Sequence, residues 1–182
     1  MSDQTSVSFA SKTAPVEGVV VVFAEEGGKL TAAAQELDEK TKGLLSKAAR
    51  ITNFKGKKEQ SVDLIAPQGL KYARVVLAGM EKPSAYSAED WLNLGGTVRG
   101  HLTGKEAPAA HIFLPDEAAA ADIANFALGA ILRGYSFKKY KTKSRKKDGA
   151  GDADDRRLKK IVIHCADRSE EHTSELQSLR HL

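Results

Sequence analysis

Several short segments of this chain are apolar on both faces, and they limit the fold more than any other feature. A strand with one face in water alternates apolar and polar side chains, whereas a strand buried on both faces of a parallel sheet is apolar throughout. The apolar runs are Val19–Phe23, Val62–Ala66, Arg74–Ala78, Ala110–Leu114 and Ile161–Cys165, and a weaker strand is expected at Ser6–Ala10. We therefore expect a sheet that is covered on both faces.

The segments between the runs predict how the strands pair. Pro67-Gln68-Gly69 separates the second run from the third, and this turn signal is short enough for a hairpin. The other runs are separated by longer segments with helical spacing, which imply crossover connections and parallel pairing. The sequence thus predicts an α/β fold with a mixed, mainly parallel sheet flanked by helices.

Three helices are expected between the strands. The first covers about Ala32–Ala49, although Gly43 weakens it. The second follows Ser87, which forms a capping-box pattern with Asp90, and the third begins after Pro115 with Asp116 as its N-cap. The inward-facing residues are Leu37, Thr41, Leu44 and Ala48 in the first helix, Trp91, Leu94, Val98 and Leu102 in the second, and Ile123, Phe126, Ala127, Ala130 and Ile131 in the third.

The composition fits one domain. The chain has 182 residues, of which 41% are hydrophobic. Its longest apolar run, Val19–Ala24, is far shorter than the roughly 18 residues of a membrane-spanning helix, and the first twenty residues lack a secretory signal. We therefore expect a soluble, cytoplasmic protein with no membrane contact. Cys165 is the only cysteine, which excludes an internal disulfide and predicts a buried side chain in the last strand.

Charge is concentrated in one segment near the carboxyl end. Seven of the ten residues 138–147 are basic, and four aspartates follow within 148–155. One interpretation is a solvated loop whose two halves partly neutralise each other. The other is a patch for the phosphate backbone of a nucleic acid or another anionic partner. The candidate residues are Lys138, Lys139, Lys141, Lys143, Arg145, Lys146 and Lys147.

Sequence patterns for catalysis are absent from this chain. It contains no phosphate-binding loop, no dinucleotide-binding glycine pattern and no nucleophile elbow. Gly95-Gly96 and Gly100 fall within a helix, where they are expected to allow close packing. His101, His111 and His164 are scattered and lack metal-ligand spacing, which indicates structural roles. We therefore expect neither catalytic residues nor metal ligands here, and the aspartate cluster does not match a calcium loop.

The segment from Asn125 to Thr142 resembles part of a known protein family. A glycine-containing amphipathic helix runs there into Tyr135-Ser136-Phe137-Lys138-Lys139-Tyr140-Lys141. Upstream, a strand ending in Val75-Val76-Leu77-Ala78-Gly79, a helix and Ile112-Phe113-Leu114-Pro115 follow in the same order. This arrangement is similar to the amino-terminal, non-catalytic domain of the leucyl aminopeptidases, also called cytosol aminopeptidases.

The resemblance implies a fold and a function. That amino-terminal domain is a macro-domain-like three-layer sandwich, and a separate carboxy-terminal domain removes amino-terminal residues from peptides with two divalent ions, manganese or zinc. The family also implies a homo-oligomer, a hexamer, in which this domain contacts its own catalytic domain. The family's metal-binding signature does not occur in the sequence, so the chain alone is expected to be inactive. The alternative is a stand-alone macro-like module that binds nucleic acid or ADP-ribose-like ligands.

The composition changes abruptly at Arg168. Residues 168–182 resemble a translated sequencing adapter, so we expect an artefactual or disordered tail after a domain that covers residues 1–167, with the catalytic domain absent. The alternative is a natural terminal helix, because Glu171 and Glu175, like Leu176 and Leu179, have helical spacing.

Overall fold

The fold is an α/β sandwich built on a seven-stranded sheet. The computed structural model describes residues 5–11, 18–102, 109–134 and 158–165. The strands are β1 (Ser6–Ala10), β2 (Val19–Glu25), β3 (Lys29–Leu30), β4 (Ser61–Ile65), β5 (Arg74–Met80), β6 (Ala109–Phe113) and β7 (Lys160–His164). The helices are α1 (Ala32–Lys40), α2 (Leu44–Ile51), α3 (Ala88–His101) and α4 (Ala120–Gly134), with a short 3-10 turn at Pro83–Ala85.

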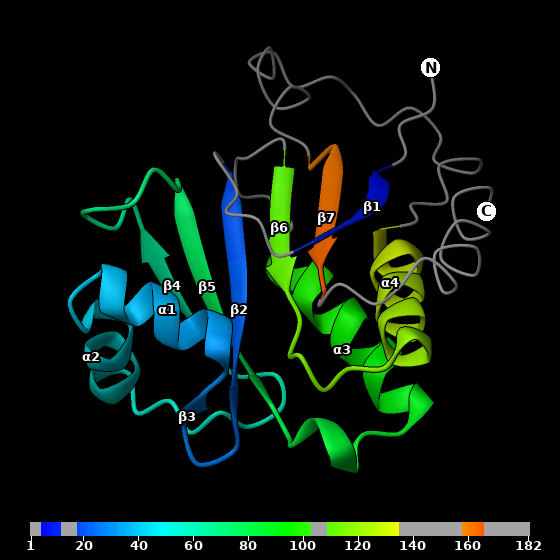
Figure 1. The fold of residues 1–182 in the computed structure, drawn as a ribbon, viewed down its shortest axis with the longest axis horizontal. Helices are drawn as coiled ribbons and strands as arrows, with labels where there is room; N and C mark the ends of the chain where they lie inside the picture. Colours follow the sequence, from blue (N-terminus) through cyan, green and yellow to red (C-terminus); the bar gives the residue numbers. More distant parts are fainter. Residues whose placement is uncertain (1–4, 12–17, 103–108, 135–157, 166–182) are drawn as a thin grey trace, which may run out of the picture.

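The sheet is mixed and mainly parallel, as predicted. Its order is β1-β7-β6-β2-β5-β4, with β3 paired to β2 (Figure 1). The pairs β1–β7, β7–β6, β6–β2 and β2–β5 are parallel. Strand β4 pairs antiparallel with β5, and β3 pairs antiparallel with β2. The predicted hairpin is therefore confirmed as the β4–β5 pair. All six predicted strands are present, with ends within two residues of those expected.

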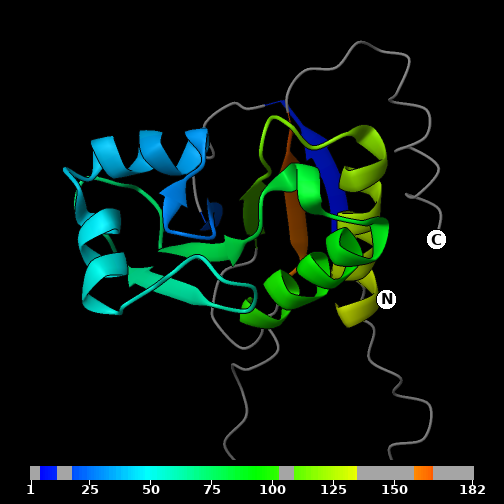
Figure 2. The ribbon, with the colours of Figure 1, turned by 90° about the horizontal axis from the view of Figure 1, so that it is seen from below.

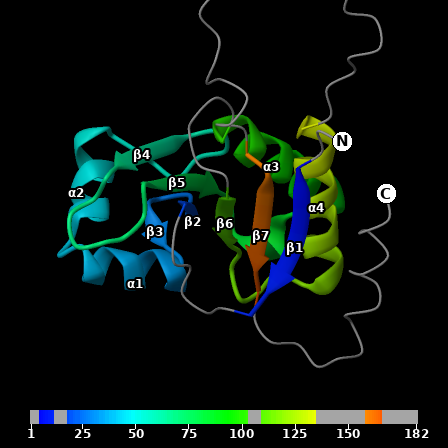
Figure 3. The same ribbon diagram turned by 90° about the horizontal axis from the view of Figure 1, so that it is seen from above.

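Two helix pairs cover opposite faces of the sheet. Viewed along the strands, α1 and α2 lie over one face toward β4, and α3 and α4 lie over the other face toward β1 (Figures 2 and 3). Alternate residues of β2 divide between the two cores. Val21 and Phe23 pack with α3 and α4, while Val20 and Val22 pack with α1 and α2. No helix in the described part of the chain is long and apolar enough to cross a membrane.

The first predicted helix is wrong in one respect, because the chain forms two helices there. Lys42 and Gly43 have φ angles of 54° and 80°, which lie in the left-handed region and end α1. The N–H of Gly43 donates to the carbonyl of Asp38 at 2.8 Å, and the Asp38 carboxylate then accepts the N–H of Ser46 at 3.0 Å in α2. The glycine that weakens a continuous helix therefore forms a sharp corner between two short ones. Leu45 is fully buried there, whereas the predicted Leu44 is only partly buried.

The second predicted helix is confirmed, and the start of the third is corrected. Ser87 and Asp90 form the full capping box of α3. By contrast, Asp116 lies in a turn that precedes α4, and the helix begins at Ala120. The N–H of Ala119 donates to the Asp122 carboxylate at 2.8 Å, so the acidic group at this helix start comes from inside its first turn. The predicted stripes on α3 and α4 are buried, except that Ile131 is only partly covered.

Helices α3 and α4 approach each other closely because glycines lie at their crossing. A Cβ atom added to Gly129 would lie 1.8 Å from the carbonyl oxygen of Leu92, and one added to Gly95 would lie 2.0 Å from that of Phe126. No side chain fits at either position without moving a helix backbone. Gly96 differs from both, since its nearest neighbour would be 3.7 Å away. The packing role predicted for these glycines therefore holds for Gly95.

Alanine substitutions should separate packing from helix propensity. We expect Gly129→Ala to lower the free energy of unfolding by about 2 kcal/mol or more, because its methyl group would force the helices apart. Gly96→Ala is the matched control in the facing helix, and it should be neutral or stabilising by up to about 1 kcal/mol, since alanine favours helices. Urea unfolding followed by circular dichroism measures both. Equal effects of the two substitutions would contradict the packing role.

A buried arginine joins the edge hairpin to the end of α3. Arg74 is 5% exposed, and its guanidinium donates to both carboxylate oxygens of Asp63 at 2.8 Å. Two of its nitrogens also donate to the carbonyl of His101 at 3.1 Å. That carbonyl is at the carboxyl end of α3, where the helix dipole favours a cation. One side chain therefore fixes β4, β5 and α3 together.

Candidate functional site

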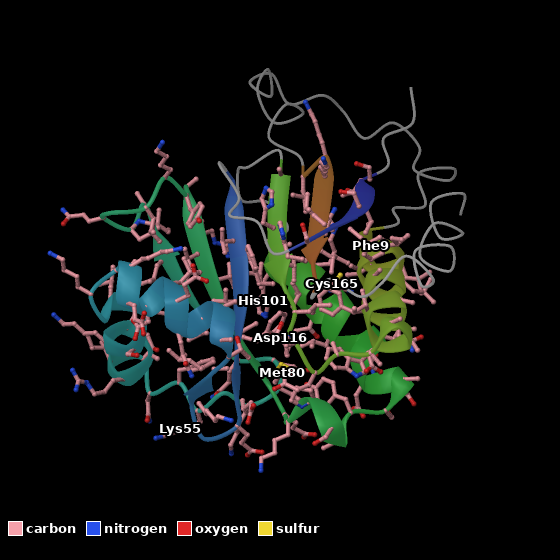
Figure 4. The ribbon with its side chains drawn as sticks, in the orientation of Figure 1. Phe9, Lys55, Met80, His101, Asp116 and Cys165 are labelled. Atoms are coloured by element: carbon pink, nitrogen blue, oxygen red, sulfur yellow. The ribbon has the colours of Figure 1, made fainter. Side chains whose placement is uncertain are left out.

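A small pocket lies at the carboxyl edge of the parallel strands. The chain after β2 turns toward α1 on one face, whereas the chain after β6 turns toward α4 on the other, and ligands of open α/β sheets bind at such a point. The pocket has a volume of about 150 Å³ and lies between the start of α1 and the turn before α4. Asp116 in that turn and Met80 at the end of β5 both lie at this edge (Figure 4).

The pocket combines a helix start with acidic side chains. Thr31 precedes α1 but does not cap it, because its hydroxyl donates instead to the carbonyl of Phe23 at 2.9 Å. Glu25, Asp116 and Glu117 line the same pocket. Lys29 also lines the pocket and pairs with Glu25 at 3.6 Å, so the net charge of these side chains is negative and opposes the binding of phosphate groups. Ligand pockets for drug-sized molecules measure roughly 300–1,000 Å³. The charge and size of this pocket therefore disfavour an ADP-ribose-like ligand.

Two histidines form a hydrogen-bonded pair on the sheet face opposite α3 and α4. His111 of β6 and His164 of β7 lie 2.9 Å apart, from Nδ1 to Nε2, and His164 Nδ1 lies 2.9 Å from the carbonyl oxygen of Ser11. A carbonyl only accepts, so His164 carries its proton on Nδ1 and its Nε2 accepts the Nδ1–H of His111. Phe113 stacks on His164 at 4.3 Å between ring centroids.

The pairing corrects the view that these histidines are scattered. Both histidines occupy the same face of adjacent strands. Their proximity becomes visible only once the strand register is known, in which Phe113 pairs with His164. The third histidine, His101, lies apart from the pair and near Ser61, whose hydroxyl is 3.4 Å from its Nδ1. Among residues 5–11, 18–102, 109–134 and 158–165, no three histidine, cysteine or acidic side chains could together hold a metal ion. The described residues therefore do not fit a two-metal centre.

Burial favours the neutral form of both paired histidines. Desolvation lowers the pKa of His111, and repulsion by Lys160 and by the protonated form of His164 lowers it further. Burial also lowers the pKa of His164, although the bond to the Ser11 carbonyl partly opposes that shift. The unfolded chain therefore binds protons at a higher pH than the folded domain does.

This difference predicts a loss of stability in mild acid. As the pH falls below about 6.5, the unfolded state takes up protons first, so the free energy of unfolding should decrease. In the double variant His111→Gln/His164→Gln, the decrease between about pH 7.5 and 5.5 should be smaller than in the parent. Urea unfolding across this range measures the slope. Carboxylates titrate alike in both proteins, so parallel curves would show that the pair does not contribute.

A broad groove runs along the outer side of α3. It has a volume of about 760 Å³, and Lys58, Tyr86 and Asp90 line one end, while Gly100 and Arg133 line the other. Lys58 bonds to Asp90 at 2.9 Å and lies over the Tyr86 ring at 5.2 Å from its centroid. Hydrogen bonds from the Ser87 side chain and backbone, and then from Lys58, hold the pKa of the Asp90 carboxyl well below its usual range. The charged groups at this end are thus mutually satisfied.

The remaining predicted features fall partly outside the described residues. The basic run from Lys138 to Lys147 and the aspartates that follow lie there, as does the tail from Arg168. Binding of an anionic partner by this run stays a prediction. Cys165 lies just beyond β7 and is half-buried against the larger core, so it is not within the strand as predicted.

Comparison with solved structures defines the class of fold. A mutant of tomato leucine aminopeptidase superposes with a TM-score of 0.71 at 21% identity, covering 100% of this chain and 37% of that one. The bottromycin maturation enzyme BotP, solved in complex with Mn, superposes with a TM-score of 0.56 at 15% identity. The fold is therefore that of an α/β domain that also occurs within these two longer chains.

Sequence comparison then gives the family. Residues 19–144 match the model of the cytosol aminopeptidase family, N-terminal domain. A probable cytosol aminopeptidase of Chelativorans sp. is 36% identical over 170 residues, and one of Rhodopseudomonas palustris is 38% identical over 159 residues. These matches cover 92% and 84% of this chain but only 32% and 31% of the relatives. The chain belongs to the cytosol aminopeptidase family, matches its N-terminal domain, and spans about a third of the length of the curated relatives it matches.

Proposed function

We propose that this chain is the non-catalytic front domain of a metal-dependent aminopeptidase that removes amino-terminal residues from peptides. The observation that carries the proposal is the match to relatives named probable cytosol aminopeptidase over only about a third of their length. Hydrolysis would then reside in the remaining two thirds, together with two divalent ions, manganese or zinc. The assembly would be a cytoplasmic homo-oligomer, a hexamer by family resemblance. The domain would be macro-like in architecture and would end at Asp167.

A chimera tests this division of labour. The chain up to Asp167 is joined to the catalytic portion of the Chelativorans relative, so that residues 168–182 are replaced. We expect hydrolysis of leucine p-nitroanilide with added Mn²⁺ by the chimera and none by the full 182-residue chain. Metal-dependent hydrolysis by the chain alone would contradict the proposal. If the native relative is active in the same assay and the chimera is insoluble or inactive, the domain boundary lies elsewhere.

Nucleic-acid binding is a second candidate function, favoured by the seven basic residues among 138–147. Phosphate contacts release counterions, so binding to a DNA duplex should weaken steeply as salt rises from about 50 to 200 mM. Replacing Lys138, Lys139, Lys146 and Lys147 by glutamine should remove most of the binding. The matched control replaces Lys40, Lys42, Lys47 and Lys55, which lie on and after α1 and α2, with the same charge change. Equal loss in both variants would indicate that only net charge matters.

A further inference from the structure

The histidine pair lies on a part of the sheet that small ions can reach. Helices α1 and α2 lie toward β4, away from β7 and β1 (Figure 3). Helices α3 and α4 cover the other face of β6 and β7, where Ile112 and Ile163 belong to the larger core. On the face of the pair, His164 is 3% exposed and His111 is partly exposed. Water and small ions therefore have access from the side of His111.

The contacts of His164 orient one of its nitrogens as a metal ligand would be oriented. Its Nδ1–H donates to the carbonyl of Ser11 at 2.9 Å, so its Nε2 carries a lone pair. A histidine that binds a metal ion usually donates its second ring N–H to a carboxylate or a backbone carbonyl in this way. Phe113 stacks on the same ring at 4.3 Å between centroids and limits its rotation. The contacts that support a metal ligand are therefore already in place.

His111 can supply a second nitrogen after one proton shift. Its Nδ1 lies 2.9 Å from Nε2 of His164 and donates the hydrogen bond between the two rings. The other tautomer of the neutral ring carries the proton on Nε2, which frees the Nδ1 lone pair. Two imidazole nitrogens then face the same small volume. Neutral imidazole is the form that binds metal ions, and burial favours that form in both side chains.

The distance between the two nitrogens favours one coordination geometry. With metal–nitrogen bonds of about 2.0 Å, adjacent ligands lie about 2.8 Å apart around a square-planar ion and about 3.3 Å apart around a tetrahedral ion. The 2.9 Å between His111 and His164 is closer to the square-planar value. Cu²⁺ and Ni²⁺ prefer that geometry, and Cu²⁺ has the higher affinity. The rings must turn on binding, because each nitrogen points at the other and the ion would lie beside the line that joins them.

We propose that His111 and His164 form a binding site for a transition-metal ion, with Cu²⁺ preferred over Zn²⁺. Water completes the coordination, because the described residues offer no group of three histidine, cysteine or acidic side chains. The charge of Lys160, which is exposed, acts on His111 and opposes the ion. The sequence led us to expect no metal ligand here, since the spacing of the histidines along the chain does not reveal the pair. The inference is independent of the proposed aminopeptidase activity.

Isothermal titration of the full 182-residue chain with Cu²⁺ tests the site. The reference protein carries Cys165→Ser, because thiols also bind copper. We expect it to bind one equivalent of Cu²⁺, and His111→Gln in the same background should bind at least about tenfold more weakly, since one ligand is lost. His101→Gln is the matched control, because His101 lies apart from the pair, near Ser61. It should bind as the reference protein does, and circular dichroism shows whether each variant is folded.

The identity of the ligands and the effect of nearby charge can be measured separately. Electron paramagnetic resonance of bound Cu²⁺ should show two equatorial nitrogen ligands in the reference protein and at most one in His111→Gln. Lys160→Gln should tighten Cu²⁺ binding, because it removes the opposing charge. Zn²⁺ should bind more weakly than Cu²⁺, and Mg²⁺, which takes oxygen ligands, should not bind.

Three results would overturn the proposal. Equal binding of Cu²⁺ by the reference protein and by folded His111→Gln/His164→Gln would place the ion elsewhere. Loss of binding in His172→Gln/His181→Gln, with none in His111→Gln, would assign the ion to the terminal histidines. Tighter binding of Zn²⁺ than of Cu²⁺ would contradict the square-planar geometry.

Discussion

Strand β2 is enclosed on all sides, and the rest of the domain is arranged around it. Its side chains from Val19 to Ala24 are at most 2% exposed, and its two edges pair with β5 and β6. Because successive side chains point to opposite faces, Val21 and Phe23 require one helix layer and Val20 and Val22 require another. A strand of this kind cannot exist in a two-layer protein. The three-layer architecture is thus a direct consequence of one short apolar sequence.

The two helix layers meet this requirement differently. Helices α1 and α2 are short, meet at a left-handed corner and carry exposed charges, so water is their outer neighbour. Helices α3 and α4 are longer, and their backbones touch at Gly95 and Gly129. The first arrangement tolerates a polar exterior because only one stripe of each helix is buried. The second places apolar and small residues on the outside as well, which a domain within a larger assembly can bury.

The sequence predicts the parts of this structure that local physics determines. Apolar runs locate the strands, and Ser87 with Asp90 locates the start of α3, because a cap satisfies its own helix. The break at Lys42 and Gly43 was missed because a glycine within a helical pattern is compatible with both a bend and a weak helix. The His111–His164 contact was missed for a different reason. It depends on the register of strands 53 residues apart in the chain, and no local pattern encodes that register.

The arginine at the start of β5 has a consequence for how the domain opens. Arg74 holds Asp63 on the edge strand β4 and the terminal carbonyl of α3 with one guanidinium group. Separation of β4 from β5 would therefore leave the guanidinium buried without its carboxylate, beside the carboxyl end of α3. Fraying of an edge strand is normally a local event. Here the opening of β4 would strand a buried charge against the last turn of α3, so the amide hydrogens of β4 would exchange more slowly than those of an ordinary edge strand.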